Sequence, residues 1–409
     1  MSPTEPSCRP ELSATLALRG AAVLEQGLVP DALVLIDGPD ILWSGPAGRA
    51  PAHTAAESIV HDGLILPGLV DLHCHGGGGA SFPDAADATE MLVAVHEHRR
   101  HGTTGLVASL VTADPATLRA RTGELAALAA AGEIEGIHLE GPFLSVARRG
   151  AQDPAHITAG DPELVRELAA LAGGALATMT LAPEAEGADT VIDVLAEVGA
   201  LPSLGHTDGS SAQLTRAVER SGAALRRERG RSPLPTATHL FNGMRPMHHR
   251  DPGPALAALD AAARGELVVE VIADGAHLDA RTVAHVFAIA AEDHVVLVTD
   301  AMAAAGMADG RYRLGALEVT VAAGVATLTG GDAIAGGTAH LLDVVRFAVN
   351  EAGVDLVRAV RAASSVPARV LGAQDRIGAL GAGRRADAVL VDAGLAPVAV
   401  LRAGVRVTD

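Results

Sequence analysis

The sequence predicts an α/β fold, in which a (β/α)8 TIM barrel is joined to a small β-sandwich domain built from both chain ends. Through the middle of the chain, apolar segments of four to seven residues alternate with helical stretches rich in Ala, Leu, Glu and Arg, which is typical of a parallel sheet. At both ends, short β-like segments are broken by Gly, Pro and Asp. No GxGxxG motif follows the first strand, so a closed barrel is favoured over an open doubly wound sheet.

The domain limits follow from where this alternation of apolar segments and helical stretches begins and ends. The segments LALRGAAVL, DALVLIDG and DILWSG predict short strands near the front, and ADAVLVDA and APVAVLRAGVRV predict strands at the back. We therefore expect residues 1–66 and 374–409 to form the β-sandwich domain, in which the two ends could share one sheet. Residues 67–373 would form the barrel, because 409 residues suffice for a barrel of roughly 250 to 300 residues and a smaller module.

The barrel strands are expected where short apolar segments end in polar residues. Eight such segments are found, at residues 68–73, 104–110, 134–139, 177–181, 202–205, 236–239, 267–273 and 295–299. Two further helical stretches, 339–352 and 355–372, follow the last strand and lead back to the β domain.

Composition excludes several classes of partner. Lys and Arg number 31 against 49 Asp and Glu, and a formal charge of −18 repels nucleic acid and anionic membranes. The chain contains no lysine, so an anionic substrate has to meet arginine. Cys8 and Cys74 are too few for a disulfide framework, the N-terminal stretch lacks a signal-peptide pattern, and no apolar run of about 18 residues occurs. We expect a cytoplasmic enzyme.

Histidines and carboxylates recur where the predicted strands end. The residues concerned are His73, His75, Glu140, His206, His239, His277 and Asp300. Because the carboxyl ends of barrel strands converge on one rim, where barrel enzymes carry their catalytic groups, these side chains are expected to meet.

The motif DLHCH predicts a pair of metal ligands. In an extended segment, His73 and His75 lie on the same side, about 6.6 Å apart along the chain, so both imidazoles can bind one ion. Cys74 would then point the opposite way. In a chain with 17 histidines, one HxH pair can also arise by chance, but its position after LILPGLVD favours a ligand pair.

A carboxylate and two imidazoles predict a hydrolytic metal site. Glu140 ends the apolar segment IEGIHLE, and it joins His206 of PSLGHTD and His239 of TATHLFN in a set that leaves a position open for water. Alone, Glu140 could equally be a helix N-cap neighbour. His138 would share the face of Glu140 deeper in the barrel, and we expect it to support the site. Asp300 ends HVVLVTDA and could shuttle a proton, although a capping role for the next helix is the alternative.

These segments together resemble a known family. PGLVDLHCHGGGG, GIHLEGPFLS, LGHTD, THLFNGM, DGAHLD and VTDA are similar, in sequence and in order, to the N-acetylglucosamine-6-phosphate deacetylases of the amidohydrolase superfamily. The resemblance covers nearly the whole chain. It implies Glu140, His206 and His239 as ligands of a principal metal, with His73 and His75 as ligands of a second.

The resemblance also implies roles for residues around the metals. Asp300 matches the acid/base that activates water and protonates the leaving amine, and His277 matches a substrate-contacting histidine. The Asn242 to Gly243 backbone and Arg250 match the sugar-phosphate site. In relatives that arginine reaches across from the partner subunit, which implies a homodimer.

The chain departs from the family pattern in two places. Gln152 replaces a histidine that polarises the acetyl carbonyl, and an amide can donate that hydrogen bond without carrying charge. Gly243 replaces the usual alanine. Relatives that bridge two metals with a carboxylated lysine are excluded as models, since this sequence has no lysine and the role falls to Glu140.

The function expected is metal-dependent hydrolysis of the acetamide of N-acetyl-D-glucosamine 6-phosphate, giving D-glucosamine 6-phosphate and acetate. One or two divalent ions per subunit are expected, with Zn2+ or Fe2+ ahead of Co2+ or Mn2+. Asp300 would take a proton from the activated water, and Gln152 or His277 would hold the acetyl carbonyl. The alternatives are deacetylation of N-acetylgalactosamine 6-phosphate or of an N-acyl amino acid, and a non-catalytic binding module.

Overall fold

The computed structural model describes residues 12–408, and the chain divides into two compact units between Gly68 and Leu69 and between Ala373 and Gln374. Cys8 and the rest of the N-terminal stretch lie outside the described residues. Within them, no helix combines the length and the apolar character needed to cross a bilayer.

The first unit is built from both chain ends, as expected. Its described strands form one seven-stranded sheet in the order β20-β19-β18-β4-β1-β2-β3. Their bounds are β1 Leu12–Leu24, β2 Gly27–Asp37, β3 Asp40–Pro46, β4 His53–Pro67, β18 Ala388–Val391, β19 Pro397–Arg402 and β20 Val405–Arg406. Antiparallel pairing of β18 with β4 joins the two ends, and Leu18, Val34, Ile65 and Leu390 pack together between them.

The second unit is the barrel. Its eight described strands pair in parallel, in the order in which they occur in the chain. They are β5 Leu69–Cys74, β8 Thr103–Leu110, β9 Gly136–Glu140, β10 Leu176–Leu181, β11 Leu201–Leu204, β12 Thr236–Ala237, β13 Val268–Val271 and β14 Val295–Leu297. Each lies within or beside one of the eight predicted segments, so the predicted barrel is confirmed.

Backbone hydrogen bonds just beyond β14 close the barrel against β5. The Asp300 N–H donates to the His73 carbonyl oxygen at 2.9 Å, and the His75 N–H donates to the Ala301 carbonyl oxygen at 2.7 Å. The first and last strands therefore meet at the end of the barrel where the predicted site residues lie.

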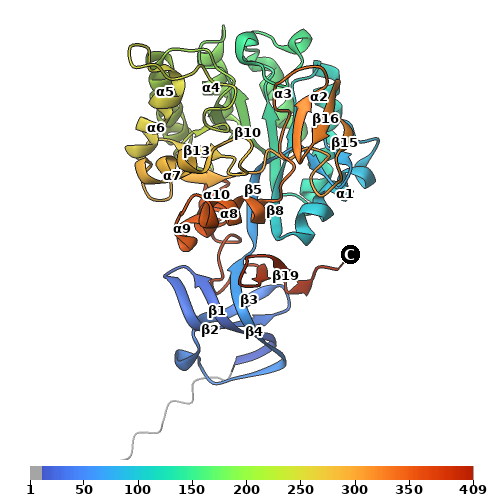
Figure 1. Ribbon diagram of the computed structural model, residues 1–409, viewed down its shortest axis with the longest axis vertical. Helices are drawn as coiled ribbons and strands as arrows, with labels where there is room; N and C mark the ends of the chain where they lie inside the picture. The colour runs from blue at the N-terminus through green and yellow to red at the C-terminus, as the bar shows by residue number, and fades with distance from the viewer. Residues whose placement is uncertain (1–11, 409) are drawn as a thin grey trace, which may run out of the picture. The chain divides into compact units, whose positions relative to one another are not determined.

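Helices surround the barrel strands, as Figure 1 shows. They are α1 Ala88–Arg100, α2 Pro115–Ala130, α3 Pro162–Ala172, α4 Ala188–Glu197, α5 Ser211–Glu228, α6 Gly253–Ala263, α7 Ala280–Ile289 and α8 Leu341–Asn350. At the starts of α1, α2, α3 and α7, an aspartate side chain accepts hydrogen bonds from backbone N–H groups that have no partner within the helix. In α3, Leu164, Val165 and Leu168 form the buried face, with the spacing of an amphipathic helix.

The stretch 355–372 is two helices rather than the single one predicted. Helix α9 spans Leu356–Ala362 and α10 spans Ser365–Val370, with Ser364 outside helical geometry between them. Pro367 lies near the start of α10, and proline is accepted in a first helical turn but not in a helix interior. One long helix would have placed it in the interior.

A small antiparallel sheet follows the barrel strands and is absent from the sequence-based prediction. It consists of β15 Gly310–Leu314, β16 Leu317–Ala322 and β17 Val325–Leu328 (Figure 1). Its two turns contain two residues each, and Gly315, Ala323 and Gly324 adopt positive φ, as tight hairpins require. A shorter hairpin, β6 Gly76–Gly77 and β7 Ala80–Ser81, follows β5.

Candidate active site

Six predicted residues meet where the barrel strands end: His73, His75, Glu140, His206, His239 and Asp300. His73 lies on β5 and Glu140 ends β9, while His206 and His239 follow β11 and β12 by two residues each. The side chains come from strands far apart in sequence. Their convergence therefore depends on the parallel barrel, in which all strands end at one rim.

The first cluster joins Glu140 to two imidazoles. The Oε1 atom of Glu140 lies 3.0 Å from His206 Nε2 and 2.9 Å from His239 Nε2. The two Nε2 atoms are 3.2 Å apart. These atoms surround one point, as the ligands of a single ion do.

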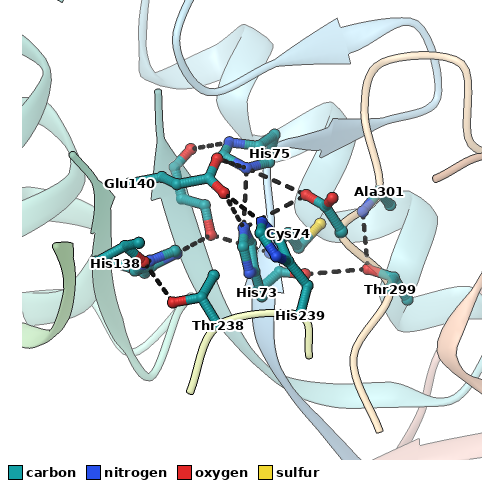
Figure 2. Close-up of polar contacts among 12 residues, drawn as sticks. His73, Cys74, His75, His138, Glu140, Thr238, His239, Thr299 and Ala301 are labelled. Atoms are coloured by element: carbon teal, nitrogen blue, oxygen red, sulfur yellow. Dashed lines mark hydrogen bonds and ion pairs between the residues drawn. The ribbon is translucent and has the colours of Figure 1, made fainter. Parts of the chain in front are cut away.

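The second cluster uses the other oxygen of the same carboxylate. His73 Nε2 lies 3.0 Å from His75 Nε2, and His75 Nε2 lies 3.1 Å from Glu140 Oε2 (Figure 2). Asp300 Oδ1 lies 3.3 Å from both imidazole Nε2 atoms. Glu140 is thus shared by two adjacent groups of side chains that could each hold a metal ion.

Hydrogen bonds at the far nitrogens fix the imidazole tautomers. In three of the four rings, Nδ1 faces an oxygen, and these pairs are His206 with the Arg148 carbonyl at 2.7 Å, His75 with the Ser109 carbonyl at 3.2 Å, and His73 with Glu270 Oε2 at 3.1 Å. A carbonyl or carboxylate oxygen only accepts, so Nδ1 carries a proton and, in the neutral ring, the Nε2 lone pair faces the cluster. Such converging lone pairs fit a divalent metal.

The carboxylates carry charge although they are buried. Burial raises the pKa of the Glu140 carboxyl, but three imidazoles led by His73 outweigh burial and hold that pKa well below its usual range. Burial also raises the pKa of Asp300, and His73 and His75 more than offset it. Both groups are therefore anionic at neutral pH, and anions shielded from water need positive charge beside them.

Three site residues have strained backbone conformations. His206, His239 and Asp300 have φ of 47°, 28° and 48°, in the left-handed region that non-glycine residues seldom adopt. Each such residue costs about 1–3 kcal/mol and persists only where surrounding contacts fix it. Here the barrel hydrogen bonds supply those contacts, for example Asp300 N–H to the His73 carbonyl. The strain turns each side chain inward at the point where its strand ends.

A cavity of about 280 Å³ opens over the two clusters. Nine predicted residues line it: His75, Glu140, Gln152, His206, His239, Asn242, Gly243, His277 and Asp300. The sequence-based prediction omits the rest of its wall, which consists of Gly150, Ala151, Leu314, Ala333, Ile334 and Gly336. The hairpin region around β15 to β17 therefore supplies one side of the cavity, on a scale suited to a small molecule.

Gln152 is held by two hydrogen bonds. Its Nε2 donates to Glu140 Oε2 at 2.5 Å, and its Oε1 accepts from the Thr112 N–H at 2.8 Å. The second hydrogen of the amide nitrogen is not used by either bond, and Gln152 lines the cavity.

His277 is paired with a carboxylate that orients it. Its Nδ1 lies 2.7 Å from Asp274 Oδ2, and both side chains are less than 10% exposed, at 4% and 8%. Burial lowers the pKa of His277, but the bond to Asp274 outweighs burial, so the net shift is upward. The Nε2 side of the ring is left for the cavity.

Of the predicted sugar-phosphate residues, Asn242 and Gly243 line the cavity and Arg250 does not. Asn242 Nδ2 donates to the His239 carbonyl at 3.2 Å. Gly243 has φ of +60°, and a Cβ there would lie 2.8 Å from His206 Nδ1, so glycine fits this backbone. Arg250 is exposed and lies outside the cavity lining, with its Nη1 2.7 Å from His249 Nε2.

His138 and Cys74 lie behind the site, as expected. His138 bonds through Nδ1 to Ser109 Oγ at 3.0 Å and through Nε2 to Thr180 Oγ1 at 2.8 Å. Burial holds the pKa of His138 well below its usual value, so the ring is neutral. Cys74 Sγ lies 3.3 Å from His98 Nε2, on the side away from the clusters.

Sequence reasoning does not single out Glu270 or Asp274. Glu270 is the one charge inside the apolar strand segment VVEV, and a carboxylate in such a strand signals a buried partner. Asp274 precedes His277 by three residues, a spacing at which a loop carboxylate reaches back to an imidazole. Both signals were present in the sequence, but neither names its partner.

Comparison with known proteins agrees with this geometry. Residues 64–407 match the model of the Amidohydrolase family. The chain is 34% identical over 338 residues to the N-acetylglucosamine-6-phosphate deacetylase of Bacillus subtilis (strain 168), covering 81% of each chain. It is also 34% identical over 338 residues to the N-acetylgalactosamine-6-phosphate deacetylase of Escherichia coli O157:H7, covering 81% of this chain and 84% of that one.

A solved structure is similar along nearly the whole chain. It is a mutant of the N-acetyl-D-glucosamine-6-phosphate deacetylase of Mycobacterium smegmatis, in complex with N-acetyl-D-glucosamine-6-phosphate. The TM-score is 0.88 at 38% identity, covering 97% of this chain and 100% of that one.

Proposed function

We propose that this chain, which belongs to the amidohydrolase family, is an enzyme that hydrolyses the acetamide group of N-acetyl-D-glucosamine 6-phosphate to D-glucosamine 6-phosphate and acetate. The observation that carries the proposal is the convergence of four imidazole Nε2 atoms and two carboxylates beneath a cavity of about 280 Å³. The solved relative holds the proposed substrate.

Glu140, His206 and His239 would hold the principal cation, and His73 and His75 would hold a second beside it. When bound there, a divalent cation supplies Lewis acidity, which acidifies water and polarises a carbonyl oxygen. Imidazole and carboxylate ligands suit Zn2+ or Fe2+, with Co2+ and Mn2+ as further candidates.

Asp300 is the proposed acid and base. It lines the cavity and is anionic, so it accepts a proton from the attacking water. As the carbon–nitrogen bond breaks, the same carboxyl returns that proton to the leaving nitrogen, which departs as the amine. One water is consumed, and the acetyl group leaves as acetate.

Gln152 and His277 would position the acetyl group. Because Gln152 is anchored to Glu140 and to the Thr112 backbone, its free amide hydrogen has a fixed direction. His277 lies on the cavity wall, and the bond to Asp274 raises its pKa, which favours the protonated ring and its Nε2–H donor. Preorganised donors of this kind stabilise charge that develops on a carbonyl oxygen.

Arg250 and the Asn242 to Gly243 backbone are the proposed phosphate contacts. In one chain, Arg250 lies outside the cavity lining, which agrees with a phosphate contact made from a second subunit. A guanidinium binds phosphate through two parallel hydrogen bonds. We therefore infer a homodimer in which each Arg250 serves the partner's site. The free, buried thiol of Cys74 agrees with a reducing compartment, and we propose the cytoplasm.

The first experiment is acetate release from N-acetylglucosamine 6-phosphate, from its unphosphorylated counterpart and from N-acetylgalactosamine 6-phosphate, on protein whose metal content has been counted. Fast release that requires phosphate and stops with a chelator is expected. No release from any of the three, with metal bound, would refute the proposal.

The galacto epimer is the second candidate substrate. The chain is as similar to the Escherichia coli N-acetylgalactosamine-6-phosphate deacetylase as to the Bacillus subtilis enzyme, at 34% identity. Comparing kcat/KM for the two phosphorylated epimers separates these assignments.

A further inference from the structure

Glu270 is a buried carboxylate that the proposed chemistry does not use. It lies on β13 among Val268, Val269 and Val271, and it is 1% exposed. Removing a carboxylate from water costs several kcal/mol unless its charge is balanced by partners. The buried position of Glu270 therefore implies a hydrogen-bonding partner that the carboxylate orients or stabilises.

One oxygen of Glu270 contacts both ligand clusters. The Oε2 atom lies 3.1 Å from His73 Nδ1 and accepts a hydrogen bond from the His239 backbone N–H at 3.2 Å. His73 belongs to the second cluster, and His239 belongs to the first. A single atom thus connects the side chain of one ligand to the backbone of another.

We propose that Glu270 is the positioning residue that enables a second cation to bind at His73 and His75. The carboxylate accepts from Nδ1–H, which selects the tautomer whose unprotonated Nε2 faces His75 and Asp300. Without Glu270, the proton can move to Nε2 and block that position. The inference rests on the proposed metal-dependent function.

The principal cluster depends less on Glu270. His206 is oriented by the Arg148 carbonyl, and Glu140 by Gln152, and neither side chain contacts Glu270 in any described hydrogen bond. His239 meets Glu270 only through its backbone. Loss of Glu270 is therefore expected to empty the second position before the first.

Charge around the clusters also favours two cations. Three buried carboxylates lie together, Glu140, Glu270 and Asp300. The chain has no lysine, and no arginine occurs among the described residues that line the cavity. One divalent cation leaves one of these three negative charges unbalanced in a site shielded from water, so the site still attracts a second cation.

The test is a zinc titration of metal-free wild-type, Glu270→Ala and Glu270→Gln proteins, with the metal-to-protein ratio measured after dialysis. We expect two zinc ions in the wild type and one in Glu270→Ala. Glu270→Gln keeps an oxygen that accepts both bonds but loses the charge, so it should retain the second ion about 10- to 100-fold more weakly.

Glu97→Gln is the matched control. Glu97 is also buried, and its Oε1 lies 2.9 Å from His340 Nε2, away from both clusters. This variant should bind two zinc ions. Loss of the second ion in Glu97→Gln would overturn the proposal, because Glu97, His101 and His340 form another potential ligand group.

Other outcomes also decide the matter. A wild-type ratio of one, or wild-type affinity for the second zinc in Glu270→Ala, would overturn the proposal. A purely structural Glu270 would lower the unfolding free energy of the alanine variant and leave its zinc ratio at two. Zinc binding is measured without substrate. Two ions in the wild type and one in Glu270→Ala, without acetate release, would refute the function and leave the role of Glu270 standing.

Discussion

Replacing Asp274 by asparagine should remove most of the pH dependence that His277 gives to the stability of the barrel. The two side chains are 2.7 Å apart, and each is less than 10% exposed. A hydrogen bond to a charged group contributes about 1.5–3 kcal/mol. Asp274→Asn should therefore lower the pKa of His277, because the charged partner that raises this pKa is lost.

The direction of the pH effect follows from the two pKa shifts. The pKa of His277 is raised, so its contribution is complete below the unfolded value of about 6.5 and is lost as pH rises through the folded pKa. The pKa of Asp274 is lowered: burial opposes this, and the bond to His277 outweighs burial. Its contribution is present above about 3.9 and is lost as pH falls through the folded pKa.

The difference in stability between wild type and Asp274→Asn should therefore be largest between about pH 4 and 6.5. We expect about 1.5–3 kcal/mol at pH 5.5 and a smaller difference at pH 9.5. Urea unfolding at the two pH values measures this difference. His277→Gln and the double variant complete a double-mutant cycle, in which the coupling energy should show the same pH dependence. Equal destabilisation at both pH values would refute the reasoning.

Three further predictions concern the site and the core. Asp300→Asn should keep the metal content while lowering kcat about 10²- to 10⁴-fold, and near-normal turnover would contradict its role as acid and base. Arg250→Ala should raise the KM for the phosphorylated substrate and leave the KM for an unphosphorylated analogue unchanged. If the KM for the phosphorylated substrate were the same in the variant as in the wild type, this would argue against phosphate binding by Arg250. Phe82→Ala, at a fully buried side chain, should cost about 3–5 kcal/mol of unfolding free energy, whereas Val60→Ala, at a side chain 74% exposed, should stay within about 0.5 kcal/mol.

The strands and the metal-ligand candidates could be predicted because both depend on local patterns. Short apolar segments that end in His, Glu or Asp mark parallel strands and their catalytic ends. The segments around His73, Glu140 and Asp300 illustrate this, since each is a buried strand with the polar residue near or just beyond its end. The missed sheet, β15 to β17, has the alternation and the glycine turns of hairpins.

The helix at 355–372 shows where local patterns fail. The helix-like pattern continues through Ala363 and Ser364, and only the position of Pro367 signals the break between α9 and α10. A proline that is tolerated in a first turn does not by itself reveal whether a new helix begins before it.

The sequence by itself determined the order of the eight barrel strands and which polar residues stand at their ends, because strand and helix periodicity are encoded within short windows. Only the tertiary structure decided which oxygen of Glu140 serves which imidazoles, that Gln152 is bonded to Glu140, and that Glu270 lies behind His73. These contacts join residues 12 to 197 positions apart, and their geometry depends on barrel closure and on strained backbone at the strand ends, which no local pattern specifies.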